Sequence, residues 1–285
     1  MKPFGQISFG MNFRTPLTKW IFENLEAFDC LEVMVDHYIY GGERTRSILH
    51  QLADRVPLIG HGVGLSIGTD APLDEGYLEQ VAETLTRLGI KEYSEHLAFT
   101  KTDKIDLANL LPLPRSDQFV ESVVPRIRLV QSVVPASFSL ENISYLFEFP
   151  GSHLTDAEVF NILYQETGVG MLLDLENLHV NSTNHRFDAE DFVASIPRGM
   201  VRGIHIAGGP VVHRSYLAQH VLVDTHSDRV PAEVYQLFSK TLELHCPKTV
   251  ILERDDDALG QREDIIEDLQ KARGVFQSVQ TSATP

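Results

Sequence analysis

The chain of 285 residues has little cysteine and no long apolar run. Its two cysteines, Cys30 and Cys246, lie far apart and form no CxxC pair, so neither a disulfide framework nor a thiolate metal site is indicated. No apolar run approaches the roughly 18 residues of a membrane span, and the N-terminus lacks the apolar segment of a signal peptide. We therefore expect a cytoplasmic protein that does not associate with membranes.

Basic residues are also scarce. The sequence has 24 Lys and Arg against 40 Asp and Glu, which gives a formal net charge of -16. Binding to phosphate backbones depends on clustered Lys and Arg, so nucleic acid is not an expected partner. A solvated acidic surface explains most of the charge, and carboxylates that hold metal ions would account for part of it. Hydrophobic residues make up 43% of the chain, which is enough for a sizeable core.

Short apolar runs alternate with segments of helical periodicity along the whole chain. About eight strands and about eight helices follow one another, which is typical of a (β/α)8 TIM barrel in the α/β class. We expect a single domain over residues 1–285, with a frayed tail at about 280–285. An open doubly wound sheet is the alternative, but no dinucleotide-binding glycine motif follows the first strand.

Several local signals refine this series. Thr155-Asp-Ala-Glu158 matches a capping box at the start of a helix over 155–167, and a short helix is expected over 189–195. Residues 101–115 and 181–185 are predicted to be loops. The connection over 208–228 is long and contains three histidines, and such long connections in compact domains are usually functional.

Many of the predicted strands end at a His, Asp or Glu. Because the carboxyl ends of parallel strands meet on one face of a barrel, we expect these side chains to face a common cavity. Two adjacent loops add an amide, a carboxylate and a further imidazole. The set is His61, His96, Glu141, Asp174, His205 and Glu253 at strand ends, with Asn177, Asp224 and His226 from the loops.

This set of side chains predicts a metal centre. A single buried histidine is more often hydrogen-bonded within a core, but burying several acids together without a cation costs roughly several kcal/mol each. Nine ligands are too many for one ion, so two or more metals with a bridging carboxylate fit better. Asp224 and His226 are two residues apart, which directs both side chains to one side of an extended segment.

Other polar residues are weaker candidates. Glu32 is a candidate for an inward-facing barrel residue, and Asp36 and His37 are candidates to line the barrel mouth. His179 is either an extra ligand, a substrate contact or a structural hydrogen-bonding residue. Arg254 is expected to pair with Asp255 or Asp256.

The motifs around these residues resemble those of the multinuclear non-haem iron-dependent oxidases, in the same order and over nearly the whole chain. That family includes the iron enzymes of methanobactin and thiaglutamate biosynthesis. The resemblance implies a barrel of the xylose-isomerase type that holds two or three irons as Fe2+ and Fe3+, with Glu141 as the bridge. The matching segments are 60–68, 94–97, 140–144, 172–177, 204–208, 223–226 and 252–255.

The resemblance also implies a reaction. O2 would be the co-substrate, and a cysteine of a ribosomally synthesised precursor peptide would be modified, with a separate partner protein binding the leader of that peptide. It assigns catalytic roles to His61, His96, Glu141, Asp174, Asp224 and His226. Glu95, Glu176 and His179 stand where Asp, Asn and Tyr are frequent in the family, so the product of the reaction does not follow from the sequence.

Two other functions remain open at this stage. A divalent-metal sugar isomerase, epimerase or hydrolase on the same barrel explains the ligands equally well, although a nuclease would want a basic groove. A non-catalytic metal-binding or scaffold protein would bind metal without leaving a coordination position open.

Overall fold

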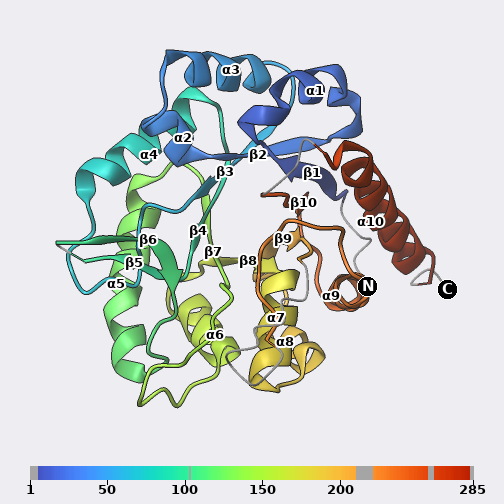
Figure 1. Ribbon diagram of the computed structural model, residues 1–285. Helices are drawn as coiled ribbons and strands as arrows, with labels where there is room; N and C mark the ends of the chain where they lie inside the picture. The colour runs from blue at the N-terminus through green and yellow to red at the C-terminus, as the bar shows by residue number, and fades with distance from the viewer. Residues whose placement is uncertain (1–5, 103, 210–220, 256–259, 283–285) are drawn as a thin grey trace. The chain divides into compact units, whose positions relative to one another are not determined.

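The computed structural model describes residues 6–102, 104–209, 221–255 and 260–282. Parallel strands close into a barrel in the order β1-β10-β9-β8-β7-β4-β3-β2, with helices between them along the chain (Figure 1). The predicted (β/α)8 TIM barrel is therefore confirmed. The chain divides into two compact units, residues 30–172 and residues 1–29 with 173–285, called here the middle unit and the terminal unit.

The middle unit contributes neighbouring strands whose register aligns the polar strand ends. His61 pairs with Ser94, and Ser94 pairs with Ser139. Two residues further toward the carboxyl ends, His96 pairs with Glu141. Helices α4 and α5 pack against each other, as do α5 and α6. The elements are β2 (Cys30–Met34), α2 (Val35–Ile39), α3 (Glu43–Ala53), β3 (Leu58–Gly62), α4 (Glu75–Arg87), β4 (Glu92–His96), β5 (Phe99–Lys101), β6 (Asp106–Leu111), α5 (Asp117–Val133), β7 (Ser137–Glu141) and α6 (Asp156–Thr167).

The segment 101–115, predicted as a loop, instead carries most of an antiparallel hairpin formed by β5 and β6 (Figure 1). Thr102 turns the chain, since its N–H donates to the carbonyl of Ile105 and its hydroxyl oxygen accepts from the N–H groups of Lys104 and Ile105. Most side chains of β6 are exposed. Backbone pairing therefore holds the hairpin together. Because the side chains of β6 are mostly exposed, the sequence shows little of the hydrophobic periodicity that predicts a strand.

The terminal unit brings together the two ends of the chain. β1 pairs with β10 and β10 pairs with β9, all in parallel, and α10 packs on β1, β10 and α9. The elements are β1 (Ser8–Asn12), η1 (Thr15–Leu17), α1 (Thr18–Glu23), η2 (Leu25–Ala27), α7 (Leu175–His185), α8 (Ala189–Ser195), β9 (Val201–Ile206), α9 (Ala232–Leu244), β10 (Thr249–Leu252) and α10 (Arg262–Ser282). β8 (Gly170–Asp174) has its first residues in the middle unit and its last two in the terminal unit.

Helix ends show where local signals succeeded and failed. The capping box of Thr155 and Glu158 is confirmed at the start of α6, and α8 spans 189–195 as predicted. The predicted loop at 181–185 is wrong, because those residues are the last turns of α7. Asp174 caps the start of that helix by accepting a 2.6 Å hydrogen bond from the N–H of Asn177. The helix then continues through residues that have low helix propensity.

No helix in the described part of the chain is both long and apolar enough to cross a membrane. The single domain over 1–285 remains a prediction. Of the tail predicted to fray, residues 280–282 belong to α10, and residues 283–285 lie outside the described residues. The same holds for 210–220, which includes two of the three histidines of the long connection.

Candidate metal centre

Three predicted ligands of the middle unit converge at the ends of β3, β4 and β7. We call His61, His96 and Glu141 the triad. Oε2 of Glu141 lies 3.2 Å from Nε2 of each histidine, and the two Nε2 atoms are 3.4 Å apart. His61 and Glu141 are buried at 2% and 1% exposure, while His96 is partly exposed. The strand register explains the approach, because His96 and Glu141 are direct partners in neighbouring strands.

The other ring nitrogen of each histidine is already occupied. Nδ1 of His96 is 3.1 Å from the carbonyl oxygen of Gly62, which only accepts, so Nδ1 must carry the proton. Nδ1 of His61 is 2.8 Å from the hydroxyl of Ser94. In the neutral form, His96 therefore presents an unprotonated Nε2 toward Glu141.

In this form the Nε2 lone pair of His96 faces the Glu141 carboxylate. Such a pair of acceptors repels unless a proton or a cation lies between them. Ligand atoms about 2.1 Å from one metal ion stand roughly 3.0–3.4 Å from each other. The observed separations of 3.2 to 3.4 Å match that range, so the triad could hold a metal ion.

The predicted ligands of the terminal unit form a second group, which we call the acidic cluster. Oε2 of Glu253 lies 3.1 Å from Nδ1 of His205 and 2.9 Å from Nδ1 of His226. Oδ2 of Asp174 lies 3.8 Å from Nδ1 of His205 and 3.6 Å from Nε2 of His226. Asp224 completes the group, with Oδ1 2.8 Å from Nε2 of His226.

Opposite charges dominate the acidic cluster. Burial lowers the pKa of His226, but the adjacent Glu253 and Asp224 carboxylates outweigh it and raise that pKa well above its ordinary value. Burial raises the pKa of Glu253, and the neighbouring His205 and His226 outweigh it and bring that pKa well below its ordinary value. A metal ion bound by the same carboxylates would take the place of a proton on His226.

Backbone geometry fixes two of these residues. His226 has φ of 45°, a left-handed conformation that costs a non-glycine residue on the order of 1 kcal/mol, and its carbonyl accepts from the N–H of Asp255. Asp174 uses Oδ1 to cap α7 and thereby directs Oδ2 toward the histidines. Asn177 is buried in the first turn of α7, and its role as a ligand remains a prediction.

Sequence reasoning missed Asp255 as a candidate ligand. An oxygen of its carboxylate lies within 4.8 Å of ligand atoms of His226 and Glu253. The signal was present, since Asp255 is two residues after Glu253 and such residues share one side of an extended chain. Arg14 and Asn12 also bind this carboxylate.

The weaker candidates have other surroundings. Arg254 is fully buried and pairs with Asp268 at 2.7 Å, a partner that the sequence did not predict. Of the two expected partners, Asp256 lies outside the described residues. Asp36 accepts hydrogen bonds from the hydroxyl of Tyr77 and the N–H of Val63 and thereby holds the segment after β3. Glu32 is buried and His37 is exposed.

Glu176 and His179 lie on α7 near the acidic cluster. Burial raises the pKa of Glu176 to about 7; His226 lowers it and Asp224 raises it further. Burial lowers the pKa of His179. Burial therefore disfavours the charged form of both side chains.

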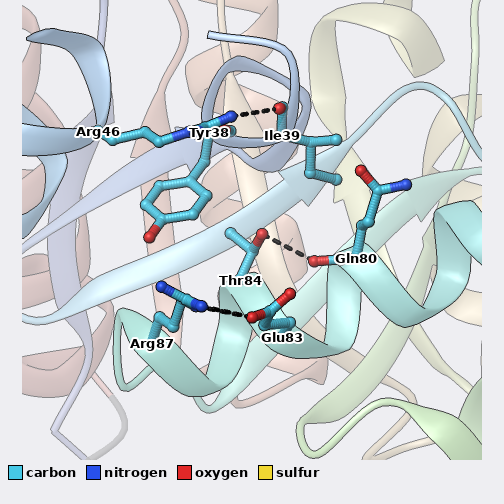
Figure 2. A pocket seen from close by; sticks show the side chains of 7 residues that line it. All are labelled: Tyr38, Ile39, Arg46, Gln80, Glu83, Thr84 and Arg87. Carbon is cyan, nitrogen blue, oxygen red and sulfur yellow. Dashed lines mark hydrogen bonds and ion pairs between the residues drawn. The ribbon is translucent and has the colours of Figure 1, made fainter. Parts of the chain in front are cut away.

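A pocket of about 190 Å³ lies elsewhere on the middle unit and contains none of the predicted site residues (Figure 2). Its polar groups bind one another: Arg46 donates to the carbonyls of Tyr38 and Ile39, and Arg87 pairs with Glu83. Internal pairing of this kind leaves no argument for a ligand there. The lining residues are Tyr38, Ile39, Arg46, Gln80, Glu83, Thr84 and Arg87.

Comparison with known proteins gives a family match over most of the chain. Residues 8–277 match the family model described as RiPP precursor modification enzyme MbnB/TglH/ChrH, where RiPP denotes a ribosomally synthesised and post-translationally modified peptide. A UPF0276 protein of Rhizorhabdus wittichii is 32% identical over 87% of this chain and 86% of its own. A UPF0276 protein of Acinetobacter baylyi is 34% identical over 80% of this chain and 77% of its own.

Solved structures with a similar fold come from the xylose-isomerase-like barrels. D-psicose 3-epimerase from Clostridium cellulolyticum H10 superposes with a TM-score of 0.60 at 13% identity, over 96% of this chain and 99% of that one. A xylose isomerase-like TIM barrel protein from Mycobacterium smegmatis, in complex with magnesium, gives a TM-score of 0.63 at 13% identity, over 98% of this chain and 100% of that one. At such identities the likeness shows the barrel type alone and says nothing of the substrate.

Proposed function

Because this chain belongs to the MbnB/TglH/ChrH family of RiPP precursor modification enzymes, we propose that it is an iron-dependent, O2-using oxidase that modifies cysteine residues of a precursor peptide. A leader-binding partner protein would present the peptide. Iron would be held by the triad and the acidic cluster, as two or three ions in the Fe2+ and Fe3+ states. The proposed ligands are His61, His96, Glu141, Asp174, Asn177, His205, Asp224, His226 and Glu253.

The observation that carries this proposal is the geometry of the triad. Two histidines and one carboxylate with further coordination positions open are the ligand set typical of non-haem Fe(II) oxygenases. Both Nε2 atoms lie 3.2 Å from the Glu141 oxygen, and the Nδ1 of each histidine is held on its far side. These three atoms would hold an iron ion, and the iron would supply the redox chemistry.

The acidic cluster supports a second binding position. It offers three carboxylates, Asp174, Asp224 and Glu253, around two histidines. Such a set neutralises a higher cationic charge than the triad does, which suits an iron in the ferric state. Buried carboxylates also stay oriented by their histidine partners until a metal replaces the proton.

The source of sulfur distinguishes this centre from a thiolate site. Cys30 is buried, Cys246 is exposed, and neither belongs to a group of potential metal ligands in the described parts of the chain. The proposed sulfur ligand would therefore come from the cysteine of the substrate peptide. Bound iron would supply the redox chemistry with O2, while the surrounding protein orients the cysteine and excludes water.

The proposal is tested by metal content and by turnover. Protein purified without oxygen should contain more than one iron per chain, with ferrous and ferric signals in its Mössbauer spectrum. With precursor peptide and partner protein, it should consume O2 and change the mass of the peptide. His96→Ala and Asp224→Ala should abolish this turnover, while His153→Ala, at an exposed loop histidine that pairs with Asp117, should retain it.

Two results would contradict the proposal. Full activity of His96→Ala or Asp224→Ala would show that the ligands are assigned wrongly. A single Zn2+ or Mn2+ that iron cannot replace with gain of O2 reactivity, together with sugar isomerisation in the absence of O2, would favour the isomerase or epimerase alternative.

A further inference from the structure

We infer that Ser94 is the residue that positions His61 for metal binding, by fixing which ring nitrogen of His61 carries the proton. The inference rests on the proposed function, because it assigns a role within the proposed iron site. Ser94 is neither a metal ligand nor a substrate contact. It acts through the imidazole of His61.

The strand register brings the two residues together. His61 on β3 and Ser94 on β4 are direct partners in the parallel pair, so their side chains leave the sheet on the same face. Both are buried, at 2% and 5% exposure. Oγ of Ser94 lies 2.8 Å from Nδ1 of His61, a distance at which one of the two atoms must donate a proton to the other.

A second contact favours one direction of this hydrogen bond. The hydroxyl of Ser94 donates to the carbonyl oxygen of Gly60 at 3.4 Å. A serine hydroxyl has one proton, so once it is directed at Gly60 its oxygen can only accept from His61. Nδ1 of His61 then holds the proton, and the Nε2 lone pair points at the Glu141 oxygen 3.2 Å away.

The second histidine of the triad achieves the same state by different means. Nδ1 of His96 is bound by the backbone carbonyl of Gly62, which no side-chain substitution removes. The bond from His61 to Ser94, in contrast, depends on a side chain that a substitution can remove. A substitution at Ser94 therefore changes the orientation of His61 and leaves the proposed metal ligands themselves in place.

The chain offers a matched control at Ser139. This residue pairs with Ser94 in the neighbouring strand and is buried to a similar degree, at 6% exposure. In contrast to Ser94, its hydroxyl makes no hydrogen bond to any described residue. Ser139→Ala therefore removes the same atoms from a neighbouring position without touching His61.

The first arm of the test is nuclear magnetic resonance of metal-free protein with 15N-labelled histidine, in which long-range 1H–15N correlations identify the protonated nitrogen of each ring. In the wild type and in Ser139→Ala, His61 should be protonated at Nδ1. In Ser94→Ala, that assignment should be lost, and Ser94→Thr, which keeps the hydroxyl, should restore it. An Nε2-protonated His61 in the wild type would overturn the inference without requiring any variant to fold.

The second arm measures Co2+ binding to the metal-free chain in competition with a chelator, followed by the visible absorption of the bound ion. Loss of an outer partner of a metal-bound histidine typically weakens binding about 10–100-fold, and we expect this for Ser94→Ala but not for Ser139→Ala. Equal Co2+ affinity of Ser94→Ala and wild type would overturn the inference. If the wild type itself binds no metal, the proposed function fails, while the tautomer measurement still decides whether Ser94 orients His61.

Discussion

The two groups of predicted ligands differ in how they hold their histidines. In the triad, the outer nitrogens of His61 and His96 contact neutral groups, a serine hydroxyl and a backbone carbonyl. In the acidic cluster, both nitrogens of His226 face carboxylates. Neutral partners fix where the lone pair of the ring points, whereas carboxylate partners raise the pKa of the ring. The triad is thus organised for ligand geometry and the acidic cluster for charge.

The largest effect is expected from removing a proposed ligand of the triad. His61→Ala should eliminate one metal position and lower the rate of O2 consumption on the order of a thousandfold or more, because an essential group is lost outright. Metal analysis should show that the acidic cluster retains its iron. If His61→Ala kept all its metal and its rate, the triad would not be a metal site.

A buried ion pair beside Glu253 should matter for stability more than for chemistry. Arg254 and Asp268 are 0% and 2% exposed and pair at 2.7 Å, with Asp268 also accepting from the N–H of Val230. Asp268→Ala leaves a buried guanidinium without its carboxylate, which should lower the free energy of unfolding by about 3–5 kcal/mol in urea denaturation.

The exposed pair of Arg87 and Glu83 is the control for that prediction. Its charges are screened by water, so Glu83→Ala should leave the free energy of unfolding nearly unchanged. If Asp268→Ala and Glu83→Ala lowered the free energy of unfolding by similar amounts, burial of the Arg254–Asp268 pair would not contribute to stability.

The charge argument predicts how metal uptake by the acidic cluster depends on pH. His226 must lose a proton to bind metal, and its pKa is raised. Below that pKa, the affinity should fall by up to about tenfold for each pH unit, with one proton released per ion bound. Calorimetry of His61→Ala in buffers with different ionisation enthalpies measures this release. Uptake without proton release would show that His226 is already neutral.

Glu95 gives the middle unit a pH response of the opposite kind from that of Glu253. Burial, together with Asp36, raises the pKa of Glu95 to about 8, and hydrogen bonds from the N–H groups of Leu65 and His96 oppose this. The folded protein therefore holds a proton there that the unfolded chain releases above its pKa of about 4.5. Stability of the metal-free protein should thus fall as pH rises between these two values, by up to about 1.4 kcal/mol per pH unit.

Glu95→Gln should remove that pH dependence, because its amide does not titrate. Urea denaturation of the wild type and the variant at several pH values between about 5 and 8 compares the two slopes. Parallel slopes would mean that Glu95 titrates normally in the folded state.

The sequence alone determined the barrel and placed most of the candidate ligands at strand ends. Apolar runs that stop at His61, His96, Glu141 or Asp174 are local signals, and parallel strands necessarily deliver their ends to one face. Helix starts with a side-chain cap, as at Thr155, were equally visible, since a cap and its partner lie three residues apart.

Only the tertiary structure decided the partners of these residues. Arg254 binds Asp268, 14 residues away on α10, and His61 binds Ser94, 33 residues away on the next strand. The β5–β6 hairpin likewise depends on backbone pairing rather than on side-chain periodicity. Propensity and periodicity act over a few residues, whereas the register of neighbouring strands fixes which group each ring nitrogen of a histidine contacts.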